Sequence, residues 1–140
     1  LENTRIIDTR GGDNMWIQYN PNPHNKNVGD CVIRALTLAD DDEDYLRVYR
    51  ELFEIGYKKC RLPNDKLVYE KWLLDHGWTK IKMPKKPNNK RFTLREYIDD
   101  NPDLQFVASI SRHLTFVDRG TLIDTWNCSS KCLGNYWIKV

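Results

Sequence analysis

The hydrophobic period of the chain changes about two thirds of the way along. Up to residue 100, apolar residues recur mainly at intervals of three and four, the spacing of amphipathic helices. From residue 104 onward they largely alternate with polar residues, which is the spacing of strands with one buried face. Helices followed by antiparallel strands predict an α+β fold.

Capping and turn residues place the expected helices. Asp30 is suited to N-cap the first helix, and an acidic run at 40–44 precedes a second helix that Gly56 is expected to end. Thr93 and Glu96 have the spacing of a capping box. The predicted helices cover about 31–39, 45–55, 64–76 and 94–100.

Short alternating segments place the expected strands. Asp118 to Gly120 has the composition of a tight turn, so the segments on either side of it are expected to form a hairpin. The segment 78–83 alternates and is expected to lie at a sheet edge. The predicted strands cover 16–19, 78–83, 104–111, 113–117, 121–124 and 136–140.

Residues 1–14 differ from the rest of the chain. They have little periodicity and precede Met15, after which the sequence becomes compact and aromatic. We therefore expect Met15 to be the natural start and 1–14 to be a leader, either derived from an expression vector or poorly ordered, and exclude it from the fold. The length suits one hydrophobic core, so 15–140 is expected to form a single domain.

Charge and composition narrow the expected partners. The formal net charge is +2 and no apolar run approaches 18 residues, so neither nucleic acid nor a membrane is expected as a partner. The segment Lys80–Arg91 has six basic residues without interleaved aromatics, which is typical of a solvated loop. With no visible secretory signal, we expect a cytoplasmic protein with reduced thiols.

The four cysteines do not indicate a metal centre. Cys128 and Cys132 are four positions apart, but no second cysteine or histidine pair has the spacing of zinc ligands. We therefore treat Cys60, Cys128 and Cys132 as ordinary thiols and expect no cofactor.

Cys31 is the candidate nucleophile. It follows the polar Gly29-Asp30 turn and begins the first predicted helix. Unpaired N–H groups and the helix dipole favour the thiolate at such a position. A buried, inert cysteine is the alternative interpretation.

The predicted hairpin supplies partners for this thiol. Its two arms bring His113 opposite the region of Asp124 to Trp126, where cross-strand neighbours are roughly 5 Å apart. A thiol, an imidazole and an orienting carboxylate are the groups that cysteine acyl transfer requires. Asn127 is the alternative orienting group, and His113 could also be a structural histidine.

The order Cys31, His113, Asp124 resembles that of the papain-like cysteine peptidases. Gly29-Asp30-Cys31 is similar to the turn at the family's nucleophile, and Asp124-Thr125-Trp126 resembles its Asn-Ser-Trp segment. The resemblance implies a papain-like domain with a helical half that carries the cysteine and a β half that carries the histidine. Small members of this kind occur in bacteriophages and mobile elements.

The resemblance also implies an activity. It points to a hydrolase that cleaves a peptide or isopeptide bond of a protein or peptide substrate through an acyl-thioester. The position of the family's oxyanion-hole glutamine is held here by Asn25, with Asn27 and Gln18 as alternatives. A transglutaminase-like acyl transferase and an inactive module that binds a host protein are the other functions that this pattern allows.

Overall fold

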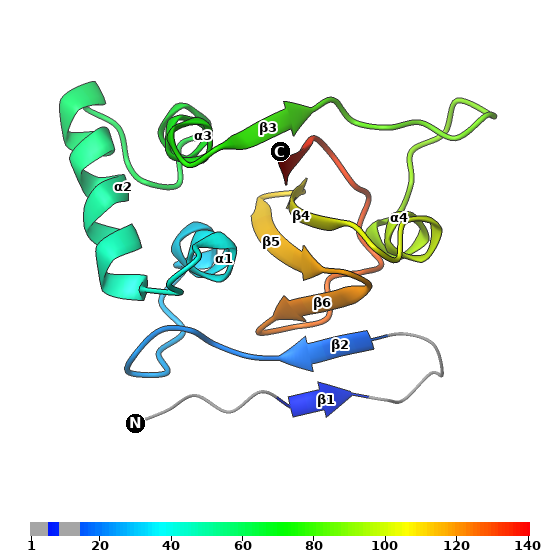
Figure 1. Ribbon diagram of the computed structural model, residues 1–140, viewed down its shortest axis with the longest axis horizontal. Helices are drawn as coiled ribbons and strands as arrows, with labels where there is room; N and C mark the ends of the chain where they lie inside the picture. Colours follow the sequence, from blue (N-terminus) through cyan, green and yellow to red (C-terminus); the bar gives the residue numbers. More distant parts are fainter. Residues whose placement is uncertain (1–5, 9–14) are drawn as a thin grey trace.

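A mixed sheet forms the centre of the protein in the computed structural model, which describes residues 6–8 and 15–140 (Figure 1). The described strands lie in the order β1-β2-β6-β5-β4-β7-β3. Neighbouring strands are antiparallel except β2 and β6, which run parallel. The strands are β1 Ile6–Asp8, β2 Met15–Gln18, β3 Trp78–Ile81, β4 Gln105–Ile110, β5 His113–Asp118, β6 Thr121–Asp124 and β7 Tyr136–Lys139.

Along the chain, three helices lie between β2 and β3, and a fourth lies between β3 and β4. They are α1 Cys31–Ala39, α2 Tyr45–Lys59, α3 Lys66–Asp75 and α4 Leu94–Asp100. The predicted α+β order of helices and antiparallel strands is therefore confirmed. The predicted edge strand is confirmed as well, because β3 pairs only with β7 in the described sheet.

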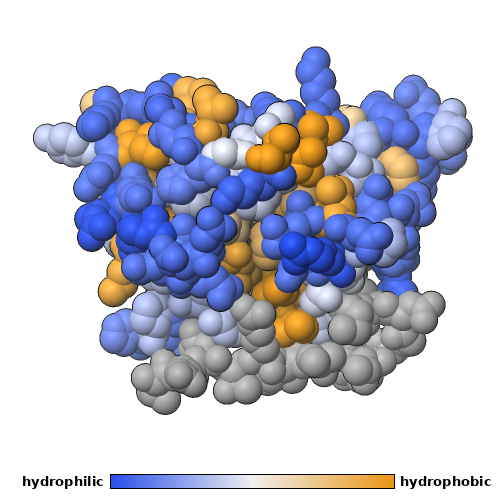
Figure 2. Space-filling model, in the orientation of Figure 1, coloured by the Kyte–Doolittle hydropathy of each residue, from blue (hydrophilic) through white to orange (hydrophobic). Residues whose placement is uncertain are grey.

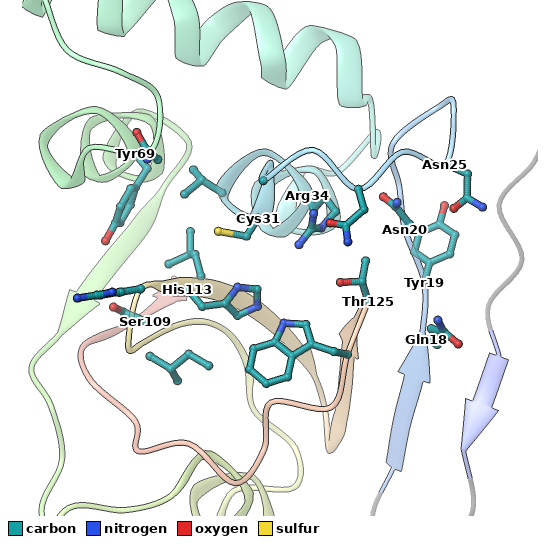
Figure 3. Close-up of a pocket in the computed structure, with 18 residues that line it drawn as sticks. Gln18, Tyr19, Asn20, Asn25, Cys31, Arg34, Tyr69, Ser109, His113 and Thr125 are labelled. Atoms are coloured by element: carbon teal, nitrogen blue, oxygen red, sulfur yellow. The ribbon is translucent and has the colours of Figure 1, made fainter.

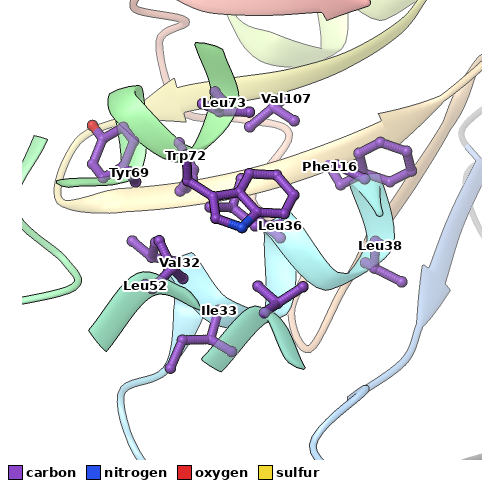
Figure 4. Packing of buried hydrophobic residues seen from close by; sticks show 14 of the residues in the cluster. Val32, Ile33, Leu36, Leu38, Leu52, Tyr69, Trp72, Leu73, Val107 and Phe116 are labelled. Carbon is purple, nitrogen blue, oxygen red and sulfur yellow. The ribbon is translucent and has the colours of Figure 1, made fainter. Parts of the chain in front are cut away.

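Two apolar cores cover the two faces of the sheet. The first packs α1, α2 and α3 against one face, and its side chains converge around the fully buried Trp72 (Figure 4). The second packs Leu94 and Ile98 of α4, with Leu133, against the other face. Alternating strand residues divide between the cores: Phe106 belongs to the second and Val107 to the first. This alternation fixes the register, since a shift by one residue would exchange the faces.

The second helix is longer than its glycine predicts. Gly56 lies inside α2, which continues to Lys59 and ends at Cys60 with a left-handed φ of 55°. The expected stop at Gly56 is therefore wrong. A Cβ at Gly56 would lie 2.4 Å from the carbonyl oxygen of Arg61. The glycine thus permits the chain after the helix to return closely against it.

Part of the predicted leader falls within the described residues. Ile6–Asp8 form β1, which pairs antiparallel with β2. The remainder of the prediction for 1–14 lies outside the described residues, and the prediction that the natural chain starts at Met15 stays a prediction.

The surface is mainly hydrophilic, as expected when the two cores bury most of the apolar side chains. Hydrophilic residues cover most of the face in Figure 2, and hydrophobic residues gather in short bands between them. Within 6–8 and 15–140, no helix is long and apolar enough to cross a membrane.

Candidate active site

A cleft of about 1190 Å³ opens where the start of α1 meets the β4–β5 turn. Cys31 and His113 both line it. Figure 3 shows Tyr69 and Ser109 on one side of Cys31, and Gln18, Tyr19, Asn20 and Asn25 on the other. The nucleophile predicted from the sequence therefore lies between two arms of an open cleft.

Cys31 is the first residue of α1 and is partly buried. The first N–H groups of a helix have no acceptor within the helix and point toward this position. Burial raises the pKa of the thiol, but a hydrogen bond with His113 and one from the backbone of Leu114 lower it. The charges of His113 and Arg34 lower it further, so that the pKa of Cys31 lies below its usual value. The site thus favours the thiolate.

His113 connects this thiol to Asp124. It is the first residue of β5, and its Nε2 lies 2.6 Å from Oδ2 of Asp124. Burial lowers the pKa of the imidazole, but hydrogen bonds with Asp124, Cys128 and Cys31 raise it to about 11. The imidazole is therefore held as the cation, and the bond at Nε2 leaves Nδ1 available to the thiol.

The hairpin register brings Asp124 to the histidine. In β5 and β6, Phe116 pairs with Ile123 and Val117 with Leu122, so the same register sets Thr115 opposite Asp124. The Thr115 hydroxyl donates a 2.6 Å hydrogen bond to the carboxylate oxygen that contacts His113. The hairpin predicted from the Asp118 turn is therefore confirmed, and it delivers the predicted His–Asp contact.

Asp124 is ionised although it is buried. Burial raises the pKa of its carboxyl group, but the hydrogen bond and charge of His113 lower it. The hydroxyl of Thr115 and the backbone N–H of Thr125 donate further hydrogen bonds, and the net pKa lies below the usual value. A carboxylate held in this way fixes the orientation of the imidazole and stabilises its charge.

Arg34 joins the nucleophile helix to the carboxylate. It is buried one turn after Cys31 and forms an ion pair with Asp30, while its Nη2 lies 4.0 Å from Oδ1 of Asp124. Asp30 has the expected N-cap position, but its carboxylate is turned to this network. It also accepts a 2.6 Å hydrogen bond from the hydroxyl of Tyr45 and a 3.2 Å hydrogen bond from Asn22.

The alternative orienting residue is engaged elsewhere. Asn127 accepts hydrogen bonds from the backbone N–H and the hydroxyl of Ser129. Trp126 instead lies beside the histidine, with ring centroids 5.3 Å apart, and is 41% exposed. It therefore covers the outer side of His113 and is not part of the core.

Asn25 is not brought to the thiol. It lies in an exposed turn with a φ of 52°, and its side chain points away from Cys31 in Figure 3. Gln18 and Asn27 also line the cleft. The oxyanion role expected for Asn25 stays a prediction, whereas the structure brings Cys31, His113 and Asp124 together.

Three site residues escaped the sequence reasoning. They are Arg34, Thr115 and Cys128, all of which contact the His113–Asp124 pair or its carboxylate. Arg34 carried a signal, since it is the one charged residue in the mainly apolar segment 31–39. Thr115 lies in a strand and Cys128 in a loop. Their contacts with Asp124 depend on how the strands pair and how the loop folds, which the sequence does not show.

His113, Asp124 and Cys128 also form a group with metal-ligand atoms, all within 4.8 Å of one another. In the structure these groups are joined by hydrogen bonds, with Sγ of Cys128 at 3.8 Å from Asp124. Zinc bound at its usual distances would separate the histidine and carboxylate atoms to roughly 3.3 Å. Their 2.6 Å contact fits a shared proton instead.

Comparison with known proteins adds no relative. No family model, curated protein or solved structure matches this chain. Functional interpretation therefore depends on the geometry of the site.

Proposed function

We propose that the protein is a cysteine hydrolase that cleaves a peptide or isopeptide bond, as a member of the papain-like superfamily. The observation that supports this proposal is the hydrogen-bonded series from Cys31 through His113 to Asp124, set beside an open cleft. The pKa of the thiol is lowered and that of the imidazole is raised, which is the charge state of an activated cysteine nucleophile.

The first half of the reaction forms an acyl-enzyme. The Cys31 thiolate attacks the carbonyl carbon, and the C–O π electrons move to oxygen to give a tetrahedral oxyanion. The backbone N–H of Cys31, in the first turn of α1, is suited to stabilise that oxyanion. His113 then transfers its proton to the amine nitrogen as the C–N bond breaks, leaving a thioester on Cys31.

The second half releases the acid. His113, now neutral, takes a proton from water, and the resulting hydroxide attacks the thioester carbonyl. Collapse of the intermediate breaks the C–S bond and releases the carboxylic acid product. The thiolate and the imidazolium are restored, and Asp124 keeps the ring in place throughout. No cofactor enters these steps.

The thiols support a reducing location. All four cysteines are free, and Cys60 and Cys132 are exposed. Because an oxidising compartment would consume exposed thiols and the nucleophile alike, we infer that the protein acts in the cytoplasm.

Hydrolysis of a peptide mixture tests this proposal. The protein is incubated with peptides from a digested proteome, with and without hydroxylamine, and the products are identified by mass spectrometry. We expect new carboxyl termini from the wild-type protein, hydroxamates at the same positions when hydroxylamine competes with water, and neither from Cys31→Ser. Absence of all cleavage by a folded protein would contradict it.

A second candidate is a binding module of the same fold without activity. The outward direction of the Asn25 side chain favours it, because an active hydrolase needs a second oxyanion donor beside Cys31. In the same experiment this candidate predicts a folded protein that yields neither new carboxyl termini nor hydroxamates. A transglutaminase-like enzyme predicts products joined to added amines in preference to hydrolysed ones.

A further inference from the structure

The two arms of the cleft differ in chemistry. Carboxamides and other neutral polar groups dominate the arm that contains Gln18, Asn20 and Asn25. The opposite arm is formed by α3 and the β4–β5 turn and contains Tyr69, Ser109 and Arg112. A peptide that crosses Cys31 would contact both arms.

Apart from the Cys31 thiolate, the charged residues that line the cleft are cations. None of the described residues that line it is an Asp or a Glu, whereas Arg34, Arg112 and the charged His113 all line it. Arg34 is neutralised by its contacts with Asp30 and Asp124. The charge of His113 is balanced by Cys31 and Asp124, so Arg112 contributes the uncompensated charge of the described lining. This charge attracts an acidic substrate group, and a positively charged substrate group would find no carboxylate among the described lining residues.

Among the described residues that line the cleft, Arg112 is the cation with no hydrogen-bond or ion-pair partner. It is exposed, and no hydrogen bond or ion pair joins its side chain to any residue within 6–8 and 15–140. It immediately precedes His113, so its Cα lies about 3.8 Å from that of the general acid. A guanidinium at this place can form a two-point contact with a carboxylate close to the scissile bond.

We propose that the cleft selects peptides with an acidic side chain beside the scissile bond and that Arg112 binds that carboxylate. This inference rests on the proposed hydrolase function and names the substrate class of the same site. The carboxamide arm contacts the rest of the peptide through hydrogen bonds that do not depend on charge.

Arg119 offers a matched control for Arg112. Both arginines occupy hairpin turns with positive φ, 54° for Arg112 and 46° for Arg119, at opposite ends of β5. Arg119 pairs with Asp118 at 2.7 Å and lies outside the cleft. Glycine adopts positive φ without strain, so Arg112→Gly and Arg119→Gly are both compatible with the fold.

Cleavage of paired peptides tests the inference. Once a cleaved peptide is found, variants with Glu, Gln and Lys at each position beside the scissile bond are compared by kcat/KM. At one position we expect a preference of about tenfold for Glu over Gln, and Lys to be the poorest. Arg112→Gly should lose this preference but still cleave the Gln peptide, and Arg119→Gly should keep the preference.

A wild-type enzyme indifferent to Glu and Gln, or a preference that survives Arg112→Gly, would overturn the inference. If no peptide is cleaved at all, the proposed function fails and the inference is tested by binding. Fluorescein-labelled peptides with a central Glu or Gln are then titrated into the folded protein. Tighter binding of the Glu peptide that is weakened by salt and lost in Arg112→Gly supports charge selection, and equal binding refutes it.

Discussion

At the residue scale, the site depends on charges that stabilise one another in a buried place. Burial alone would neutralise Cys31 and Asp124 and deprotonate His113. The imidazolium has an anion on each side of it, and the contacts outweigh the cost of burial for all three groups. Removing one charge should therefore alter the protonation state of the other two groups.

Asp124→Asn tests this coupling. Without the carboxylate, the pKa of His113 should fall from its raised value, because burial then acts without an opposing charge. The imidazolium is lost near neutral pH, and the pKa of Cys31 rises in turn. We expect kcat/KM to fall by roughly a hundredfold or more and the pH profile of thiol alkylation to move to higher pH.

Asp118→Asn is the matched control, since it removes a carboxylate from the other end of β5, where it pairs with Arg119. It should leave the alkylation profile unchanged. An unchanged profile in a folded Asp124→Asn variant would contradict the role assigned to Asp124.

Arg34 has a measurable structural role. Arg34→Met leaves the buried carboxylate of Asp30 without its cation and leaves Asp124 with His113 alone, which should lower the free energy of unfolding by about 3–5 kcal/mol. The double variant Asp30→Asn/Arg34→Met should recover part of this loss, because one unpaired charge is removed. Urea denaturation measures both.

Arg95→Met is a suitable control, because the pair that Arg95 forms with Asp99 is exposed. It should change the urea midpoint little. An Arg34→Met variant as stable as the wild type would show that the buried network does not stabilise the fold.

At the element scale, the site depends on where α1 begins and on where the β5–β6 hairpin turns. The helix begins at Cys31, and the hairpin turn at Arg119 and Gly120 sets the pairing that delivers Asp124. These features were predicted from local residues: a polar turn before an apolar segment, and a tight turn between two alternating segments. Turn residues next to periodic segments therefore predicted both the start of α1 and the position of the hairpin.

Other features depend on contacts that form only when the chain has folded, and the sequence did not predict them. Gly56 was taken as a helix stop, because glycine commonly ends helices. Its role depends on the carbonyl of Arg61, which approaches only after the chain has turned. The cap position of Asp30 was expected, but the hydrogen bond that it accepts from Tyr45 requires α1 and α2 to be packed together.

Gly56→Ala tests this interpretation of α2. The added Cβ would meet a backbone oxygen at 2.4 Å, so the segment after the helix has to shift. We expect the free energy of unfolding to fall by about 1–3 kcal/mol, although alanine is the better helix former. Thermal denaturation measures the change, with the exposed Glu54→Ala in the same helix as control.

If Gly56 acted only as a helix stop or a neutral helix residue, alanine would stabilise the protein. A higher melting temperature for Gly56→Ala would therefore contradict the close approach of Arg61.

At the scale of the whole molecule, the site lies where the two halves of the chain meet. The helical half supplies Cys31 and Arg34, and the β half supplies His113 and Asp124. The order of these residues along the chain allowed the trio to be predicted, because the hairpin places two of them without long-range assumptions. Asn25 shows the limit of such reasoning, since the direction of its side chain depends on the whole loop before α1.

The reactivity of Cys31 tests the central claim most directly. The protein is treated with iodoacetamide at about pH 6, where an ordinary thiol is almost fully protonated, and each cysteine is quantified by mass spectrometry. Exposure alone favours Cys60 and Cys132 over the partly buried Cys31. Only a thiolate stabilised by its surroundings reverses that order.

We predict that Cys31 is alkylated first, because its pKa is lowered from 9.0, and that this selectivity disappears in His113→Ala. The rate at Cys31 should rise with pH at lower values than the rates at the exposed thiols, and the removal of His113 should move that rise upward. Preferential alkylation of Cys60 and Cys132, or a Cys31 whose rate is unchanged in His113→Ala, would contradict the thiolate–imidazolium pair.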